Sequence, residues 1–249
     1  WGIGLPVAEK NGDQWGLMAP LLADPALAPE PDDVFQSAER FGELLRIRKS
    51  SRLFRLQTGD AVKEKVGFHN TGPQQIPGLI VMTVADSTGD IDLGNELVVS
   101  LFNASDEPVS FPFAAMGRQF ELHPVLAGSV DPVVRGAYYD ETADSFEVPA
   151  RTTAVFLAAR SVGDQIDYLE DLVDALEDTD VLNGGQANAL RAKLDAARES
   201  ADGNRNGAAA NQLTALINQV EALAAAGILP PADAQELLDA AYTILAALG

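Results

Sequence analysis

The sequence predicts a multidomain α+β protein in which an antiparallel β-sandwich precedes an all-α module of four helices. Between residues 51 and 160, short runs rich in Val, Ile, Leu, Phe and Thr alternate with turn sequences, as in sandwich proteins. From Ser161 onward the apolar residues recur at helical spacing instead. Residues 1–50 follow neither pattern until they end in one long predicted helix. We therefore expect three parts, spanning residues 1–50, 51–160 and 163–249.

Composition excludes several functional classes. The chain has 249 residues, 47% of them hydrophobic, which is enough to build two or three cores. Its net charge of −20 disfavours nucleic acid and anionic lipid as partners. It contains no cysteine, so disulfides and thiolate chemistry are excluded, and no apolar run reaches the roughly 18–20 residues that span a membrane. Because the chain starts WGIGLP, without Met or a signal peptide, we expect a truncated or processed polypeptide.

The first part combines a predicted loop with a predicted helix. Residues 1–33 are rich in Pro and Gly, which predicts loops. Asp32 or Asp33 is placed to cap a helix that continues to about residue 48. One apolar stripe runs along this helix, comprising Val34, Ala38, Phe41, Leu44, Leu45 and the stem of Arg48. Such a stripe needs a cover, so we expect the helix to rest mainly on the sandwich or the stripe to contact another chain.

The second part is a series of short predicted strands. The turn sequences between them are ADSTGD, NASDEP and YYDETADS, and TGDAVKEK (58–65) predicts one short helix. The predicted strands are GLIVMTV (78–84), ELVVSLF (96–102), QFELHPV (119–125), SFEVP (145–149) and RTTAVFLAA (151–159).

The third part contains an internal repeat with an offset of 47 residues. VDAL (173–176) matches VEAL (220–223), and Val181-Leu182 matches Ile228-Leu229. Two helix–turn–helix units packed as a four-helix module explain this pattern. We expect the short apolar pair in each loop to plug one end of the core.

Several segments together resemble a known enzyme family. LLRIRKSSRLFRL (44–56), GFHNTGPQQIPGLIVM, VVSLFNAS, FELHPV, DPVVR and VPARTTAVFLAAR look like the C-terminal end of pullulanase-type α-1,6-glucosidases, in the α-amylase superfamily. WGIGLPVAEKNGDQW and APLLADPALAPEP resemble the segment that precedes that end, so the likeness covers about residues 1–160. The loop ADSTGDIDLGNE (85–96) departs from the family. The resemblance implies that residues 1–50 are the last loop and final helix of a (β/α)₈ catalytic barrel, and that the sandwich follows.

The helical tail has a resemblance of its own. LINQVEALAAAGIL and the AAR and LDAA segments look like small C-terminal modules of the FIMAH type, which are appended to secreted bacterial enzymes. This likeness implies an extracellular location.

The family resemblance also implies a function. The parent enzyme would hydrolyse α-1,6-glucosidic linkages in pullulan, limit dextrins or related α-glucans, using a pair of carboxylates on the barrel strands. Those strands would precede residue 1, so we assign no catalytic residue here and expect the chain alone to be inactive. The alternative is a stand-alone module without hydrolase activity, whose sandwich binds α-glucan or whose helical tail docks on a protein or cell-surface partner.

LLRIRKSSRLFRL holds five of the seventeen basic residues, namely Arg46, Arg48, Lys49, Arg52 and Arg55. They follow the predicted helix and begin the sandwich. Cations at a helix C-terminus offset its dipole, and arginines bridge carboxylates across domain junctions. We interpret the cluster as structural and not as a nucleic-acid site.

The other candidate residues have competing interpretations. Trp1 and Trp15 could stack on a sugar ring of the substrate, although packing is the favoured role. For His69 and His123 we expect hydrogen bonding at the sandwich edge and no metal ligation. Ser50-Ser51 lacks a visible His–Asp partner, so we do not expect a nucleophile. Tyr138-Tyr139 could form a sugar platform, but a strand-edge pair is favoured.

Calcium is the one cofactor that the sequence suggests, and only as an alternative to none. DGNRNG (202–207) resembles the start of a calcium loop, but the twelfth position is Leu213 where such loops carry a bidentate acid. We therefore favour a helix connection. The acids of residues 85–96 could hold a hard cation, but a solvated loop is favoured.

Overall fold

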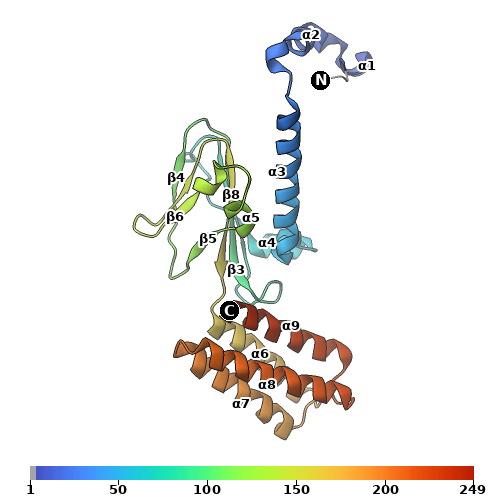
Figure 1. Cartoon of the computed structure of the whole chain (residues 1–249), viewed down its shortest axis with the longest axis vertical. Coiled ribbons are helices and arrows are strands. Elements are labelled where there is room, and N and C mark those ends of the chain that lie inside the picture. Colours follow the sequence, from blue (N-terminus) through green and yellow to red (C-terminus); the bar gives the residue numbers. More distant parts are fainter. Residues whose placement is uncertain (1–3) are drawn as a thin grey trace.

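The computed structural model describes residues 4–249 and consists of three parts along one long axis (Figure 1). A helical arm and the long helix α3 (Pro31–Ser50) come first. Two antiparallel β-sheets lie beside α3, and a bundle of helices follows beneath them. The antiparallel sheets followed by helices confirm the α+β prediction.

The N-terminal arm differs from the prediction. Residues 1–33 were expected to be loops, but short helices form, namely α1 (Ala8–Asn11), η1 (Gly12–Gln14), α2 (Trp15–Ala23) and η2 (Pro25–Leu27). The turn chemistry of this segment also suits helix starts, since Asp24 accepts a hydrogen bond from Ala26 N at 2.9 Å with Pro25 in the first helical position. None of these short helices has a buried residue.

Helix α3 begins slightly earlier than predicted. The N-cap is Glu30, not Asp32 or Asp33, and Asp33 completes a capping box by accepting a hydrogen bond from Glu30 N at 2.9 Å. Arg48 and Lys49 lie in the last turn, where positive charge opposes the helix dipole. The 3₁₀ helix η3 (Arg52–Arg55) and the helix α4 (Gly59–Lys65) lead from α3 to the first strand.

The two sheets have the strand orders β1-β2-β3-β8-β5 and β4-β7-β6. Every strand pair is antiparallel. The expected strands correspond to β2, β3, β5, β7 and β8, whereas β1, β4 and β6 are three or four residues long and were not predicted as strand runs. Tyr138 and Tyr139 do lie in β6, as the strand-edge interpretation expected.

The bounds of the strands are β1 (Val66–Phe68), β2 (Leu79–Ala85), β3 (Asn95–Asn103), β4 (Val109–Pro112), β5 (Phe120–Leu122), β6 (Tyr138–Asp140), β7 (Ser145–Val148) and β8 (Thr152–Ala159).

The larger sheet carries apolar side chains on both faces. One face packs against the smaller sheet around Phe146 and Phe156, both fully buried. The other face packs against Ile47 of α3, Leu53 of η3 and the segment containing α5 (Pro124–Ala127) and η4 (Val134–Gly136). The end of α3 is thereby held against the sheet by hydrophobic burial.

The helical bundle follows β8 almost without a linker. It contains α6 (Val162–Asp178), α7 (Gly184–Asp202), α8 (Asn206–Ala225) and α9 (Pro231–Leu248). Ser161 caps α6, and Asn183 forms a capping box with Gln186. DGNRNG forms the turn between α7 and α8, and the Asn206 side chain donates to Leu248 O at 3.0 Å.

The 47-residue repeat is visible in the loop geometry. Asp180 and Gly227 occupy equivalent positions and both have positive φ, at 57° and 72°. Each is followed by a leucine that turns back into the core. Leu182 N donates to Leu176 O at 3.0 Å, and Leu229 N donates to Leu223 O at 3.3 Å. Both Leu182 and Leu229 are buried, so each loop closes one end of the bundle core as expected.

Truncating either closing leucine should destabilise the bundle. We expect Leu182→Ala or Leu229→Ala to cost about 2–5 kcal/mol, because each substitution leaves a cavity in a close-packed core. Denaturant unfolding followed by far-UV circular dichroism measures the loss. The matched control is Ile228→Ala, since Ile228 is 37% exposed. Equal effects at Ile228 and Leu229 would contradict the closing role.

Candidate functional site

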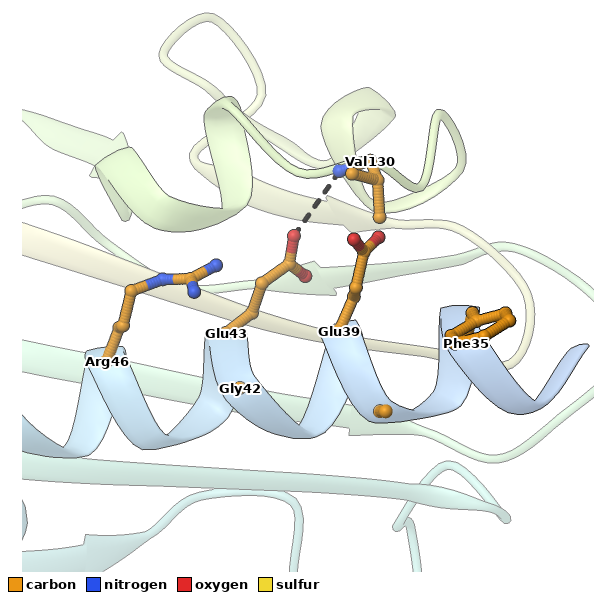
Figure 2. A pocket seen from close by; sticks show the side chains of 7 residues that line it. Phe35, Glu39, Gly42, Glu43, Arg46 and Val130 are labelled. Atoms are coloured by element: carbon orange, nitrogen blue, oxygen red, sulfur yellow. Dashed lines mark hydrogen bonds between the residues drawn. The ribbon is translucent and has the colours of Figure 1, made fainter. Parts of the chain in front are cut away.

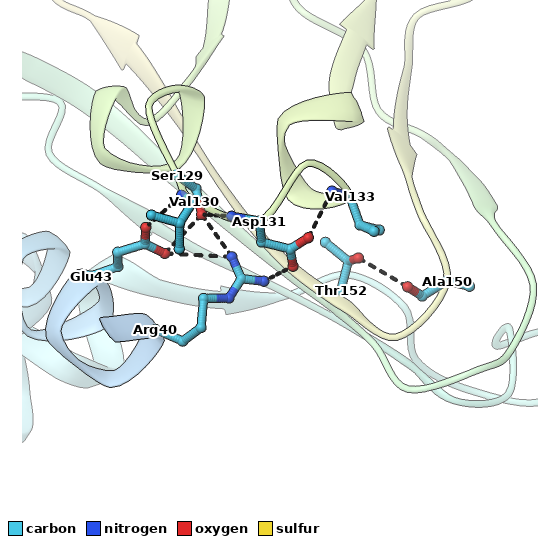
Figure 3. Close-up of polar contacts among 8 residues, drawn as sticks. All are labelled: Arg40, Glu43, Ser129, Val130, Asp131, Val133, Ala150 and Thr152. Atoms are coloured by element: carbon cyan, nitrogen blue, oxygen red, sulfur yellow. Dashed lines mark hydrogen bonds and ion pairs between the residues drawn. The ribbon is translucent and has the colours of Figure 1, made fainter. Parts of the chain in front are cut away.

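The most unusual surface of the molecule belongs to α3, whose two sides have different environments. On the side that faces the sheets, Glu43 and Ile47 are 4% and 3% exposed. The Glu43 carboxylate accepts a hydrogen bond from Val130 N at 3.3 Å (Figure 2) and one from Ser129 Oγ at 2.9 Å (Figure 3). These donors compensate a carboxylate that has been removed from water.

Arg40 completes this polar contact. Its Nη1 donates to Ser129 Oγ at 2.7 Å and lies 3.5 Å from the Glu43 carboxylate, while Nη2 pairs with Asp131 (Figure 3). Asp131 is itself fixed, because it accepts a hydrogen bond from Val133 N at 2.7 Å. We call Arg40, Glu43, Ser129, Val130 and Asp131 the clamp. It joins α3 to the loop that follows α5.

The C-terminal end of α3 makes a second contact with the same part of the sandwich. His123 Nδ1 accepts a hydrogen bond from Val125 N at 3.2 Å, which leaves Nε2–H to donate to Ser50 Oγ at 2.9 Å. Ser50 in turn donates to Ile47 O at 2.7 Å. No His–Asp partner for Ser50 was visible in the sequence, and the fold brings His123 to it. The pair is not a nucleophile and base, because the histidine donates to the serine and, within residues 4–249, the backbone N–H of Val125 and no carboxylate orients the ring. Burial lowers the pKa of His123, which favours the neutral ring.

The opposite side of α3 is apolar and exposed. Residues two positions apart on an α-helix point about 200° apart, so Phe41 and Leu45 face away from Glu43 and Ile47. Within residues 4–249 nothing covers Val34, Phe41, Leu44 and Leu45, which are 57%, 64%, 46% and 47% exposed. We call these four residues the outer face. The helix does rest on the sandwich, as one alternative expected, but it does so through Ile47 and the clamp and not through these four residues. Contact of the outer face with another chain stays a prediction.

A second apolar surface lies on the sheet beside α3. Phe68, Ile80 and Phe102 are exposed on three neighbouring strands. The register pairs Ile80 with Phe102, and Phe68 with Met82, so the three side chains are contiguous. They share the sheet face on which Val84 and Val98 contact Ile47. The outer face and this sheet surface together exceed the scattered apolar exposure that is normal for a monomer.

The basic residues of segment 44–56 have one of the two structural roles that the sequence predicted. Arg48 and Lys49 do lie at the C-terminal end of α3. The expected bridges to carboxylates do not form, since Arg46, Arg48, Lys49, Arg52 and Arg55 are exposed and none has an ion pair within residues 4–249. The residue that spans the junction is Arg40, which lies outside the cluster.

The acidic loop of residues 85–96 is not a solvated loop. Asp86 is fully buried and accepts hydrogen bonds from Lys65 Nζ at 2.9 Å and from Asp92 N at 2.8 Å. Asp92 also accepts from Ser51, and Lys65 reaches Asp90 at 3.0 Å. The Thr88 and Lys65 contacts hold the pKa of Asp90 well below its usual range. The acids therefore hold the loop together, with Lys65 as the partner that sequence reasoning missed.

Comparisons with known proteins now identify the family. Residues 1–159 match the family described as alpha-1,6-glucosidases, pullulanase-type, C-terminal, and residues 166–246 match the FIMAH domain. The chain belongs to the pullulanase-type α-1,6-glucosidases. The match lies in the C-terminal domain of that family and includes α3, both sheets and the exposed surfaces described above.

Individual relatives agree with this assignment. The chain is 45% identical over 168 residues to Pullulanase 1, chloroplastic, of Arabidopsis thaliana, and 32% identical over 110 residues to a pullulanase of Klebsiella pneumoniae. Ligand-free PulA from Klebsiella pneumoniae superposes with a TM-score of 0.55 at 27% identity, over 65% of this chain and 15% of that one. The chain therefore spans only 17% of the Arabidopsis relative and 10% of the Klebsiella pneumoniae relative.

The remaining candidate residues of this pullulanase-type chain have local roles. Trp15 is half-buried, and its indole N–H donates to Pro6 O at 2.9 Å, which closes the N-terminal arm. Trp1 lies outside the described residues, and sugar stacking by either Trp stays a prediction. His69 Nε2 lies 2.8 Å from Thr83 Oγ1, and its ring packs edge-on against Phe113. Among the described residues, no three His, Asp or Glu side chains gather as metal ligands, and no helix is long and apolar enough to cross a bilayer.

Removing the Glu43 carboxylate should release α3 from the sandwich. Glu43→Ala leaves Ser129 Oγ and Val130 N without their acceptor, at a cost of about 1–3 kcal/mol. We expect faster amide hydrogen exchange in the first half of α3, measured by mass spectrometry. Glu39→Ala is the control, because Glu39 lies one turn earlier on the same side of α3 but is exposed to solvent (Figure 2). The clamp is contradicted if both variants exchange like the parent chain.

The two histidines, of which His123 is buried, should make stability depend on pH. Burial lowers the pKa of both His69 and His123. The unfolded state therefore binds these protons at a higher pH than the folded state, and stability falls as pH drops below about 6.5. Thermal unfolding between about pH 7.5 and pH 5 should show this loss, and His123→Gln should reduce its slope. An unchanged slope in that variant would argue against a buried neutral His123.

Proposed function

We propose that this chain is the C-terminal supporting part of a debranching enzyme that hydrolyses α-1,6-glucosidic linkages in pullulan, limit dextrins or related α-glucans. The observation that carries the proposal is the division of α3 between a clamped polar side and an exposed apolar side. A helix with one side held by the sandwich and an apolar side left exposed is suited to lie between two domains. The sandwich is one of them, and the other is the catalytic part that makes up most of the length of the relatives.

The two different sides of α3 also support a role for residues 1–50 in the catalytic barrel. Residues 1–50 would be the last loop and final helix of a (β/α)₈ barrel, whose outer helices are apolar on the side that faces the strands. The catalytic carboxylates would belong to those strands, so the chain supplies support and not chemistry. Exposure of the outer face speaks against a stand-alone module, because leaving such side chains in water forfeits about 1.5–3 kcal/mol each.

Two further assignments rest on resemblance. We propose an extracellular location in a bacterium, because residues 166–246 match the FIMAH domain and the tail resembles modules that are appended to secreted bacterial enzymes. The same module would dock on a protein or cell-surface partner.

The outer face can be tested by comparing the isolated chain with the parent enzyme. The double variant Phe41→Asp/Leu45→Asp should change the stability of the isolated chain by no more than about 0.5 kcal/mol, because both side chains are already exposed there. In the parent enzyme it should cost about 3–6 kcal/mol and reduce pullulan hydrolysis, because it places charges in an apolar interface.

Differential scanning calorimetry and a reducing-sugar assay on pullulan provide the two measurements. Val62→Asp is the control, since Val62 is a 45% exposed residue of α4. Equal stability of the double variant and the parent enzyme would contradict the proposal, and so would pullulan hydrolysis by the isolated chain.

A further inference from the structure

The neck between the sandwich and the helical bundle contains a cleft with both polar and apolar walls. Strand β8 ends at Ala159 and α6 begins at Val162, so only two residues connect the two parts (Figure 1). Two adjoining cavities lie along this neck, with volumes of about 660 and 460 Å³. They share Glu96, Arg118, Arg160 and Asp164 as lining residues. Cavities of this size hold small molecules in many proteins.

The walls of the cleft are fixed in place. Arg160 is 7% exposed, and its guanidinium donates to Ser87 O at 3.2 Å and to Asp86 O. Its backbone N–H donates to Gly94 O at 3.0 Å, and its carbonyl accepts from Gln165 Nε2 at 3.0 Å. Gly89 has φ of +81°, and a Cβ there would lie 3.3 Å from Arg160 Nε. These contacts hold the acidic loop and the start of α6 together, so a ligand would meet a preorganised site.

Two donors on these walls lack a hydrogen bond. Within residues 4–249, Nε of Arg118 and Nε of Arg160 are buried atoms with no hydrogen-bond partner. Arg118 Nε lies 3.0 Å from Glu96 Oε1, which makes an ion pair without the alignment of a hydrogen bond. Both Nε atoms are enclosed, so a ligand would not reach them directly. It would meet the rest of the Arg118 side chain, which is 31% exposed and forms an ion pair with Glu96.

The charges around the cleft indicate which ligand it suits. Carboxylates of Asp164, Asp167 and Asp171 line the cleft together with Arg118 and Arg160. A phosphate or another anion would be repelled by the acids, and a cation would meet the two guanidinium groups. Hydroxyl groups donate to carboxylates and accept from arginines, so a neutral polyhydroxyl ligand can use both kinds of group. The 84% exposed Met116 and the ring of Tyr168 offer apolar surface for the carbon faces of a sugar.

We propose that this cleft binds a neutral oligosaccharide, and that it holds α-glucan at a distance from the catalytic part. The choice of α-glucan rests on the proposed function, whereas the neutral polyhydroxyl character rests on the cleft alone. Arg118 is the residue that binds the sugar hydroxyls, and Arg160 keeps the walls in position.

Calorimetric titration of the 249-residue chain with maltotriose tests this proposal, with inorganic phosphate as the rival ligand. We expect maltotriose to bind, and Arg118→Ala to weaken binding about tenfold or more, as the loss of a charge-assisted hydrogen bond predicts. Arg135→Ala is the matched control, because Arg135 is an exposed arginine of η4 that does not line the cleft. It should bind maltotriose like the parent chain, and both variants should unfold at the parent temperature.

Three results would overturn the proposal, namely no binding of maltotriose, equal binding by the Arg118 and Arg135 variants, or tighter binding of phosphate. None of them bears on the supporting role of α3, because that role is measured by the stability and hydrolysis of the parent enzyme. Conversely, the tests of α3 could fail while maltotriose still binds. The cleft would then remain a site for polyhydroxyl ligands, and its physiological ligand would be another glycan.

Discussion

The buried carboxylate of Glu43 determines which side of α3 faces the sandwich and which side faces outward. Glu43 loses water on entering the junction between α3 and the sandwich, and among the described residues it recovers hydrogen bonds from Ser129, Val130 and Arg40. A displaced α3 would leave that charge without compensation, which is costly in a protein interior. The rotation of the helix about its axis is therefore fixed, and Phe41 and Leu45 must face outward.

The parts of the fold that were predictable depend on local signals. Apolar spacing of about 3.6 residues marks α6 to α9 in the sequence, and the matched leucines after Asp180 and Gly227 mark the turns that close the bundle core. The short helices near Trp15 were missed because Pro and Gly punctuate helices and loops alike. Strands β1, β4 and β6 were not predicted as strand runs because they have only three or four residues and no longer apolar run around them. Strands β5 and β7 are as short, but they lie in the apolar runs 119–125 and 145–149.

The contacts at the candidate site were not predictable, because their partners are distant in sequence. Ser129 lies 86 residues from Glu43, and His123 lies 73 residues from Ser50. Composition shows that residues 85–96 are acidic, but it does not show that Lys65 enters the loop and buries Asp86. The sequence did show that the stripe containing Phe41 needs a cover. It could not show which side of α3 faces the sandwich, because the polar residues of the clamp look like ordinary surface residues until Ser129 and Val130 are placed beside them.

The outer face of α3 and the cleft at the neck differ in the free-energy cost of contact with water. The outer face of α3 is apolar, so water around Phe41 and Leu45 costs free energy continuously and a permanent protein cover is the stable arrangement. The cleft at the neck is lined by Arg118, Glu96 and Asp164, which water solvates well, so it can stand open and exchange ligand. Permanent association therefore belongs to the N-terminal part of the chain and reversible binding to its neck. Because β8 continues into α6 through a two-residue connection anchored by Arg160, the bundle cannot swing freely, and a sugar held at the neck would keep a constant orientation relative to α3.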